Sequence, residues 1–138
     1  MWMTEYSMES KASDASVWKV MTDVENWKEW VGGLGYSRLD GNFGEGVFGT
    51  LKNLNGPKSR FCIKDVIANK SFIMRSKFLF WTMDGIHEIT NENGVSKVKL
   101  GVRVHGPLTF IIKKLAGSAE KSLPIAAKKL IELAKLND

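Results

Sequence analysis

The spacing of apolar residues changes near Pro107 from a repeat of two to a repeat of about 3.6 residues. Apolar and polar residues alternate through residues 95–105, which is the pattern of a strand with one buried face. After Pro107, apolar residues recur every three or four positions as far as Leu133, and Pro107 itself suits the first turn of a helix. The pattern predicts a long helix over residues 108–136 that follows a series of strands.

Six further segments are typical of strands, and short turn sequences separate most of them. Together with residues 95–105, the predicted strands cover residues 2–10, 34–40, 47–54, 59–67, 71–78 and 79–90. Consecutive strands joined by tight turns must run antiparallel. We therefore expect an α+β fold in which about seven strands form one curved antiparallel sheet, and the long helix covers its apolar face.

Residues 13–33 interrupt this series and predict two short helices. Ser13 is a good N-cap for the first helix, and Asp23 for the second. Trp27 and Trp30 are three positions apart and so share one face of the second helix. The predicted order of elements is one strand, two helices, six strands and a long helix.

Size and composition indicate a single domain over residues 1–138. Cys62 is the only cysteine, which excludes an intramolecular disulfide and suits a reducing compartment. The first residues lack the basic and apolar regions of a signal peptide, and no apolar run approaches the roughly 20 residues of a membrane span. We therefore expect a cytoplasmic protein without integral membrane association.

The net charge of +5 does not by itself indicate a partner. Several lysines recur on the polar side of the predicted C-terminal helix, where a solvated helix face is the simplest interpretation and contact with an anionic membrane or a nucleic acid is the alternative. The four arginines are scattered along the chain rather than clustered. Because clustered arginines and exposed aromatic residues are typical of nucleic-acid binding, we expect no nucleic-acid partner.

The aromatic and methionine side chains of the central strands are candidates for the lining of a cavity. They are Phe61, Phe72, Met74, Phe78, Phe80, Trp81 and Met83. They are equally suited to fill a closed core, and both interpretations place them inside the protein. The sequence leaves these two alternatives open.

His87 is the strongest candidate for chemistry, since an imidazole in an apolar cavity can act as acid or base near neutral pH. A structural histidine is the competing interpretation. His87 and His105 lie on separate predicted strands, and no cysteine cluster accompanies them, so we expect no metal site and no cofactor. No catalytic residue is assigned.

The order of elements and several local sequences resemble the START-like helix-grip superfamily, also called SRPBCC. The segments that carry the resemblance are Ala12–Trp18, Thr22-Asp23, Trp30–Gly33 and the glycine turn Gly41–Gly46. The likeness extends over the whole chain and is greatest to small bacterial proteins described as polyketide cyclase/dehydrase or lipid-transport proteins. It implies a ligand cavity between the sheet and the C-terminal helix.

The resemblance implies that the chain binds a hydrophobic small molecule, such as a lipid, a polyketide or an aromatic compound. The expected ligand-binding residues are Trp27, Trp30, Phe61, Phe72, Met74, Trp81, Met83, His87, Leu115 and Ala119, with Arg75 as a further polar contact. Two alternatives stay open, an aromatic cyclase/dehydrase-type enzyme and a protein-interaction module like the chaperone activators of this fold. The sequence does not determine the ligand or the oligomeric state.

Overall fold

A computed structural model describes residues 1–107 and 109–138, without the side chains of 109–113, 115 and 116. The elements follow the predicted order. They are β1 (Trp2–Ser10), α1 (Asp14–Met21), the 3₁₀ helix η1 (Val24–Glu29), β2 (Leu34–Leu39), β3 (Phe48–Asn53), β4 (Lys58–Ile67), β5 (Ser71–Lys77), β6 (Thr82–Glu92), β7 (Val95–His105) and α2 (Thr109–Leu136).

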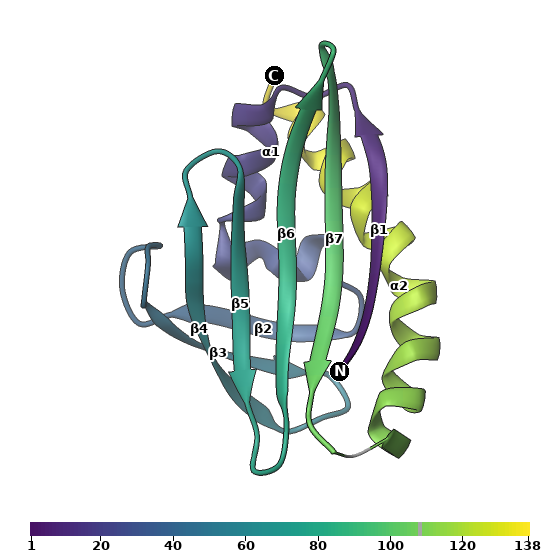
Figure 1. Cartoon of the computed structure of the whole chain (residues 1–138). Coiled ribbons are helices and arrows are strands. Elements are labelled where there is room, and N and C mark those ends of the chain that lie inside the picture. Colours follow the sequence, from purple (N-terminus) through teal and green to yellow (C-terminus); the bar gives the residue numbers. More distant parts are fainter. Residues whose placement is uncertain (108) are drawn as a thin grey trace.

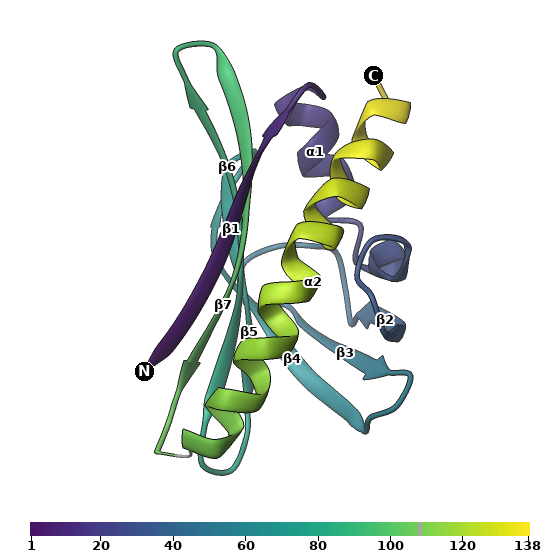
Figure 2. The ribbon, with the colours of Figure 1, turned by 90° about the vertical axis from the view of Figure 1, so that its right-hand side faces the viewer.

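The strands form one sheet in the order β1-β7-β6-β5-β4-β3-β2, and all neighbouring strands are antiparallel (Figure 1). Figure 2 shows that the sheet curls around one side of α2, with α1 and η1 on that same side. The predicted α+β helix-grip architecture is confirmed. Within the described residues, no helix has both the length and the hydropathy that crossing a membrane requires.

The two short helices have different geometries. Ser13 caps α1 as predicted, because its hydroxyl accepts a hydrogen bond from the backbone N–H of Ser16 at 3.2 Å. The second helix is a 3₁₀ helix rather than an α-helix, and the side chain of Asp23 does not cap it. In a 3₁₀ helix residues three apart lie in one row, so Trp27 and Trp30 both point into the core.

The core lies between the inner, concave face of the sheet and the helices. Alternate residues of the strands meet small apolar residues of α2 there, and α2 also contacts α1. Small side chains on α2 allow the helix to pack close to the sheet. The central members of this core include Phe61, Ile63, Phe72, Val98, Leu100, Ala126, Ala127, Leu130 and Ala134.

The β5–β6 connection differs from the prediction. Residues 78–81 form the hairpin turn, and β6 begins only at Thr82. Leu79 is 87% exposed and Phe80 63% exposed, so the expectation that Phe80 lies inside the protein is wrong, as it is for the exposed Phe78. Beyond the turn, the pairing of β6 with both neighbours is continuous through Gly85, and no irregularity occurs there.

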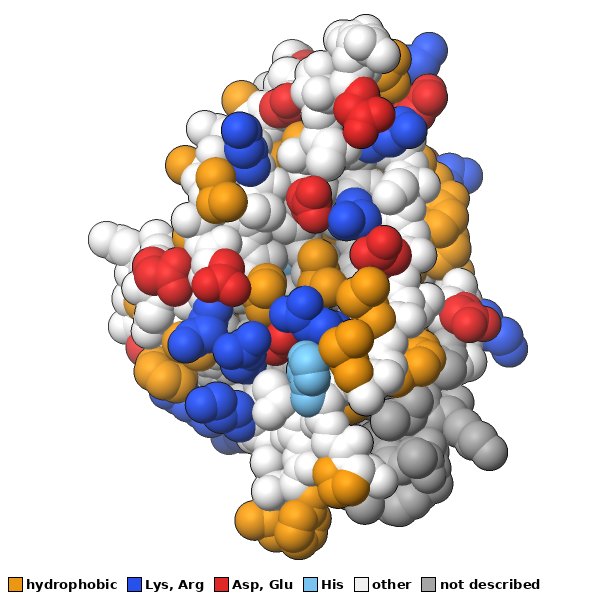
Figure 3. Space-filling model, in the orientation of Figure 1, with side chains coloured by type: hydrophobic (Ala, Val, Ile, Leu, Met, Phe, Trp, Pro, Cys, Tyr) orange, Lys and Arg blue, Asp and Glu red, His pale blue; other side chains and the backbone are white. Residues whose placement is uncertain are grey.

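Figure 3 shows many charged side chains of both signs on the outer face of the sheet. Asp84 is fully buried on this face because Arg75 and Arg103 cover it and donate hydrogen bonds of 2.8 Å to its two oxygens. Burial alone would raise the pKa of Asp84. The hydrogen bonds and positive charges of the two arginines lower it by more, so the pKa lies below its usual value. The expectation that Arg75 contacts a ligand in the cavity is therefore wrong.

Candidate functional site

A pocket of about 250 Å³ lies on the inner face of the sheet, between η1 and the middle of α2. We call it the inner pocket. Its wall residues come from η1 and the loop that follows, from β2 and β3, from β5 to β7, and from one turn of α2. The residues around it include Trp27, Trp30, Val31, Leu34, Leu51, Asn53, Met74, Met83, His87, Leu100, Val102, Ser122, Leu123 and Ala126.

Two tryptophans of the η1 segment form one side of the inner pocket. Both are almost fully buried, with 3% of Trp27 and 2% of Trp30 exposed. The Trp27 indole is fixed by a hydrogen bond from its Nε1 to the carbonyl oxygen of Met21 at 2.9 Å. The indole Nε1 of Trp30 has no acceptor among the described residues. The wall is therefore rigid at Trp27 and has an unused donor at Trp30.

His87 lies in a cluster of aromatic rings beside these tryptophans. Its imidazole is stacked on Phe72 with ring centroids 4.3 Å apart, and on Trp27 at 5.9 Å. The ring of Trp30 meets it edge-on at 6.2 Å. The only hydrogen bond of the imidazole within the described residues joins Nδ1 to the carbonyl oxygen of Gly85, at 3.2 Å.

The aromatic surroundings keep His87 neutral. Desolvation lowers the pKa of His87 from 6.5 to about 4, and the hydrogen bond to Gly85 offsets this only in part. Because a carbonyl oxygen can only accept, Nδ1 must carry the ring proton and Nε2 must be the acceptor of the neutral ring. The pocket therefore contains an uncharged imidazole with one acceptor nitrogen.

Gly85 leaves space in the floor of the inner pocket. A Cβ atom at Gly85 would lie 3.4 Å from Cε1 of His87 and 3.5 Å from Cε of Met74, in ordinary contact with both. Any larger side chain at this position would extend from the strand into the pocket. The volume between Met74 and His87 thus depends on the absence of a side chain at Gly85.

The inner pocket has little capacity for acid–base chemistry. His87 is the only titratable side chain among the lining residues that the structure describes. Asp84 and Glu88, its neighbours along β6, belong to the opposite face of the strand. In the same part of the chain, no group of three or more histidine, cysteine, aspartate or glutamate residues is placed to hold a metal ion.

The structure brings together half of the residues expected to bind a ligand. Trp27, Trp30, Met74, Met83 and His87 line the inner pocket.

Four of the other five expected residues do not line it. Phe61, Phe72 and Ala119 are buried in the core instead. Trp81 stacks on Phe78 at the hairpin turn, with ring centroids 4.1 Å apart, so its predicted place in the wall is wrong. The side chain of Leu115 lies outside the described residues.

The sequence analysis did not predict the part of the wall that is formed by β2, β3 and the loop before β2. Leu34 of β2 and Leu51 of β3 reach the pocket because the sheet curls and returns these strands toward α2 (Figure 2). Val31 reaches it from the loop that follows η1. No local pattern signals such a return. Ser122, Leu123 and Ala126 belong to the apolar stripe of the C-terminal helix, so the sequence did contain a signal for them.

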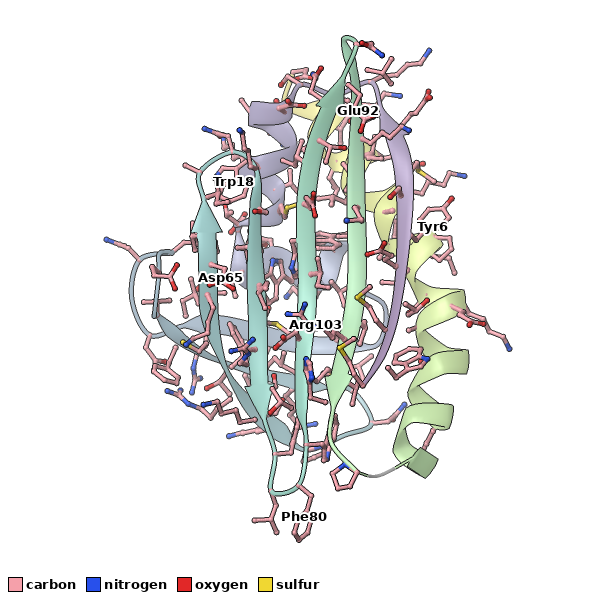
Figure 4. The ribbon with its side chains drawn as sticks, in the orientation of Figure 1. Tyr6, Trp18, Asp65, Phe80, Glu92 and Arg103 are labelled. Carbon is pink, nitrogen blue, oxygen red and sulfur yellow. The ribbon has the colours of Figure 1, made fainter. Side chains whose placement is uncertain are left out.

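Side chains on the two faces of the sheet lie in separate environments. In Figure 4 the labelled Arg103 lies on the outer face, in front of the strands, and Trp18 lies behind them near α1. Trp18 packs edge-on against Phe72 at 5.9 Å, so it supports the ring on which His87 stacks. The inner pocket is thus supported by aromatic packing and is separated by the sheet from the charged outer face.

No family model matches this chain, and no curated protein matches it. A protein from Mesorhizobium loti has a similar structure, with a TM-score of 0.77 and 12% identity over 99% of both chains. A START superfamily protein from Mycobacterium smegmatis gives a TM-score of 0.74 at 14% identity, also over 99% of both chains.

The di-domain ARO/CYC StfQ from the steffimycin biosynthetic pathway gives a TM-score of 0.72 at 9% identity. That match covers 97% of this chain and 50% of StfQ. Together these structural likenesses confirm the predicted START-like helix-grip fold.

Proposed function

We propose that this START-like helix-grip domain binds a compact, mainly apolar small molecule in the inner pocket. The observation that carries the proposal is a pocket lined by Trp27, Trp30, Met74 and Met83, with one neutral imidazole at His87. Apolar and aromatic walls with few polar groups are typical of small-molecule sites. The structural likeness to a START superfamily protein supports the same class of function.

The volume of the pocket limits the size of the ligand. An apolar cavity of roughly 150 Å³ holds benzene, so the inner pocket of about 250 Å³ has room for about ten non-hydrogen atoms. This corresponds to a bicyclic aromatic compound rather than to a long lipid chain. Stacking against indole rings would add specificity for a flat ligand.

His87 would supply the polar contact. Its Nε2 can accept a hydrogen bond but cannot donate one while the ring is neutral. A ligand hydroxyl is the matching donor. We therefore favour a ligand that combines a flat apolar body with one hydroxyl group.

The alternative of a cyclase-type enzyme is supported by the likeness to StfQ, whose name describes it as an ARO/CYC protein. General base catalysis is most efficient when the pKa of the base lies near the working pH. The pKa of His87 is about 4, and the described lining contains no carboxylate to act with it. Binding without reaction is the function that these two observations favour.

A fluorescence titration with 2-naphthol tests the proposal. We expect saturable binding at a single site, reported by the tryptophans that line the pocket. Gly85→Val should lower the affinity at least about tenfold, because the added methyl groups occupy part of the pocket. Gly44→Ala is the matched control, since a Cβ at Gly44 meets no atom of the described residues within 4 Å and Gly44 does not line the pocket.

A second comparison tests the role assigned to His87. Wild-type protein should bind 2-naphthol about three- to tenfold more tightly than naphthalene, which lacks the hydroxyl. His87→Phe keeps an aromatic ring but removes the acceptor, so this preference should disappear. Unsaturable fluorescence with the wild type, or equal affinities for Gly85→Val and Gly44→Ala, would contradict binding in the inner pocket.

A further inference from the structure

The tip of the β5–β6 hairpin exposes large apolar side chains. We call residues 78–81 the hairpin tip. Leu79 is 87% exposed, Phe80 63% and Phe78 37%. Figure 4 shows Phe80 at the end of the hairpin, beyond the rest of the sheet. Isolated apolar residues are common on protein surfaces, but a contiguous group at one projecting turn indicates a contact surface.

The conformation of the turn does not explain these residues. Tight turns favour glycine, asparagine, aspartate and proline, and the hairpin tip contains none of them. A hydrogen bond of 2.8 Å from the backbone N–H of Phe78 to the carbonyl oxygen of Trp81 closes the turn without help from any side chain. Phe78 and Trp81 stack on each other, which leaves Leu79 and Phe80 as the projecting pair.

A groove lined by cationic side chains lies next to the hairpin tip, on the outer face of the sheet. We call it the basic groove. Its charged lining residues are Arg60, Lys64, Arg75 and Lys77, and no carboxylate lines it in the described part of the chain. Lys77 directly precedes the hairpin tip in the chain, so the two surfaces are adjacent. In Figure 3 lysine and arginine side chains gather above the apolar lower end of this face.

The charges of this groove are only partly compensated. Arg60 pairs with Asp40 at 2.8 Å, and Arg75 shares the buried Asp84 with Arg103. Among the described ion pairs, none involves Lys64 or Lys77. Together Arg75, Arg103 and Asp84 carry one net positive charge. The basic groove therefore has a surplus of positive charge next to exposed apolar side chains.

We propose that the hairpin tip and the basic groove dock this domain on the surface of an anionic lipid bilayer. Leu79 and Phe80 insert among the acyl chains near the headgroups, and the lysines and arginines lie at the level of the anionic headgroups. This pairing of an apolar insertion with adjacent positive charge is what peripheral membrane binding requires. The proposal does not depend on whether the inner pocket binds a ligand.

A bilayer fits this surface better than a second copy of the chain. A symmetric contact between two copies would bring the basic grooves of both close together, and like charges would repel. A bilayer with anionic headgroups instead neutralises the groove and accepts a narrow projecting tip. It needs no complementary pocket for Leu79 and Phe80.

Co-sedimentation with vesicles tests the proposal. We expect binding to phosphatidylcholine vesicles that contain about one-third phosphatidylserine, weak binding to pure phosphatidylcholine, and loss of binding as salt is raised. Leu79→Ser/Phe80→Ser should lower the partition coefficient at least about tenfold. Lys64→Glu/Lys77→Glu should lower it at least about 25-fold, since each surface lysine contributes about fivefold.

Two control variants separate docking at this surface from general stickiness. Ile67→Ser changes a residue of similar exposure, 57%, at the last position of β4, beside the β4–β5 turn and away from the hairpin tip. Lys128→Glu/Lys129→Glu makes the same change in net charge on α2, which covers the other face of the sheet. Both should bind vesicles nearly as wild type does.

Three results would overturn the proposal. The first is equal binding to neutral and anionic vesicles. The second is unchanged vesicle binding by Leu79→Ser/Phe80→Ser, which would assign the tip to a protein contact. The third is tip-dependent self-association in light scattering without any vesicle binding, which would assign the tip to a second copy of the chain.

Discussion

The imidazole of His87 lies flat on the ring of Phe72, with the ring centroids 4.3 Å apart and the planes within 7° of parallel. Phe72 is itself 99% covered and is supported from behind by Trp18. The stack therefore holds the imidazole away from bulk water on one side while its edge faces the inner pocket. This loss of hydration explains why His87 stays neutral. Among the described residues only the hydrogen bond to Gly85 favours the charged form of the imidazole.

The lowered pKa of His87 predicts a specific pH dependence of stability. Between pH 4 and 6.5 the unfolded chain binds a proton at His87 that the folded protein does not bind. The free energy of unfolding should therefore fall as the pH decreases from about 6.5 to 4, by about 3 kcal/mol from this residue alone. Urea unfolding at a series of pH values measures the change.

His87→Phe isolates this contribution from that of the carboxylates. The variant lacks the titrating group, so the difference in stability between it and the wild type should change over pH 4–6.5 and be constant above. NMR titration of the imidazole gives the folded-state pKa directly. A measured pKa near 6.5 would show that the ring is hydrated and would remove the basis of this prediction.

The apolar stripe of α2 predicts a contrast between two residues two positions apart. Leu130 is fully buried against the core, and Lys128 is exposed. Leu130→Ala should cost about 2–5 kcal/mol of unfolding free energy, because it leaves a cavity. Lys128→Ala should change it by less than about 0.5 kcal/mol. The reverse order in urea unfolding would mean that α2 presents a different face to the sheet.

The fold was predictable because its signals are local. Alternation along residues 95–105 predicts a strand with one buried face, and in β7 the alternate residues Val98, Leu100 and Val104 are buried. The change of period at Pro107 located the final helix to within one residue of its start at Thr109. Both signals depend only on residues close together in the chain.

The rest of the site was not predictable for two physical reasons. Apolar residues continue from Phe78 to Trp81 without a turn residue, so periodicity alone extended the strand through what is a turn. Leu34 and Leu51 approach the pocket only through the curl of the whole sheet, which is set by contacts between distant residues. Whether volume remains unfilled depends on this packing and cannot be obtained from patterns in the sequence.

Asp84→Asn should destabilise the protein strongly. The substitution leaves Arg75 and Arg103 next to each other without the carboxylate that both contact at 2.8 Å. We expect a loss of about 2–4 kcal/mol, somewhat less than for a fully buried pair, since both arginines retain access to water. Chemical denaturation measures it.

Asp40→Asn is the matched control for Asp84→Asn. Asp40 and Arg60 are also 2.8 Å apart, but their side chains are 48% and 57% exposed. An exposed pair contributes little to stability, because water solvates each partner when the other is removed. Equal effects of the two substitutions would contradict the structural role assigned to Asp84.

Gly49→Ala should disturb the packing of β3 against its neighbours. A Cβ at Gly49 would lie 2.4 Å from Cζ of Phe61 and 2.5 Å from the carbonyl oxygen of Arg38. The Phe61 ring can shift, but the backbone of β2 cannot without breaking its pairing with β3. We expect a loss of about 1–3 kcal/mol or more in unfolding free energy.

Two further variants test whether the stability loss of Gly49→Ala comes from the contact with the backbone of β2. Gly44→Ala adds the same methyl group at a position where no atom of the described part of the chain lies within 4 Å, so its stability should stay close to that of the wild type. Gly49→Ala/Phe61→Leu removes the clash with the ring but keeps the clash with Arg38, so it should not recover the stability of Phe61→Leu alone. Full recovery would show that the aromatic ring, and not the close approach of β2, requires glycine at this position.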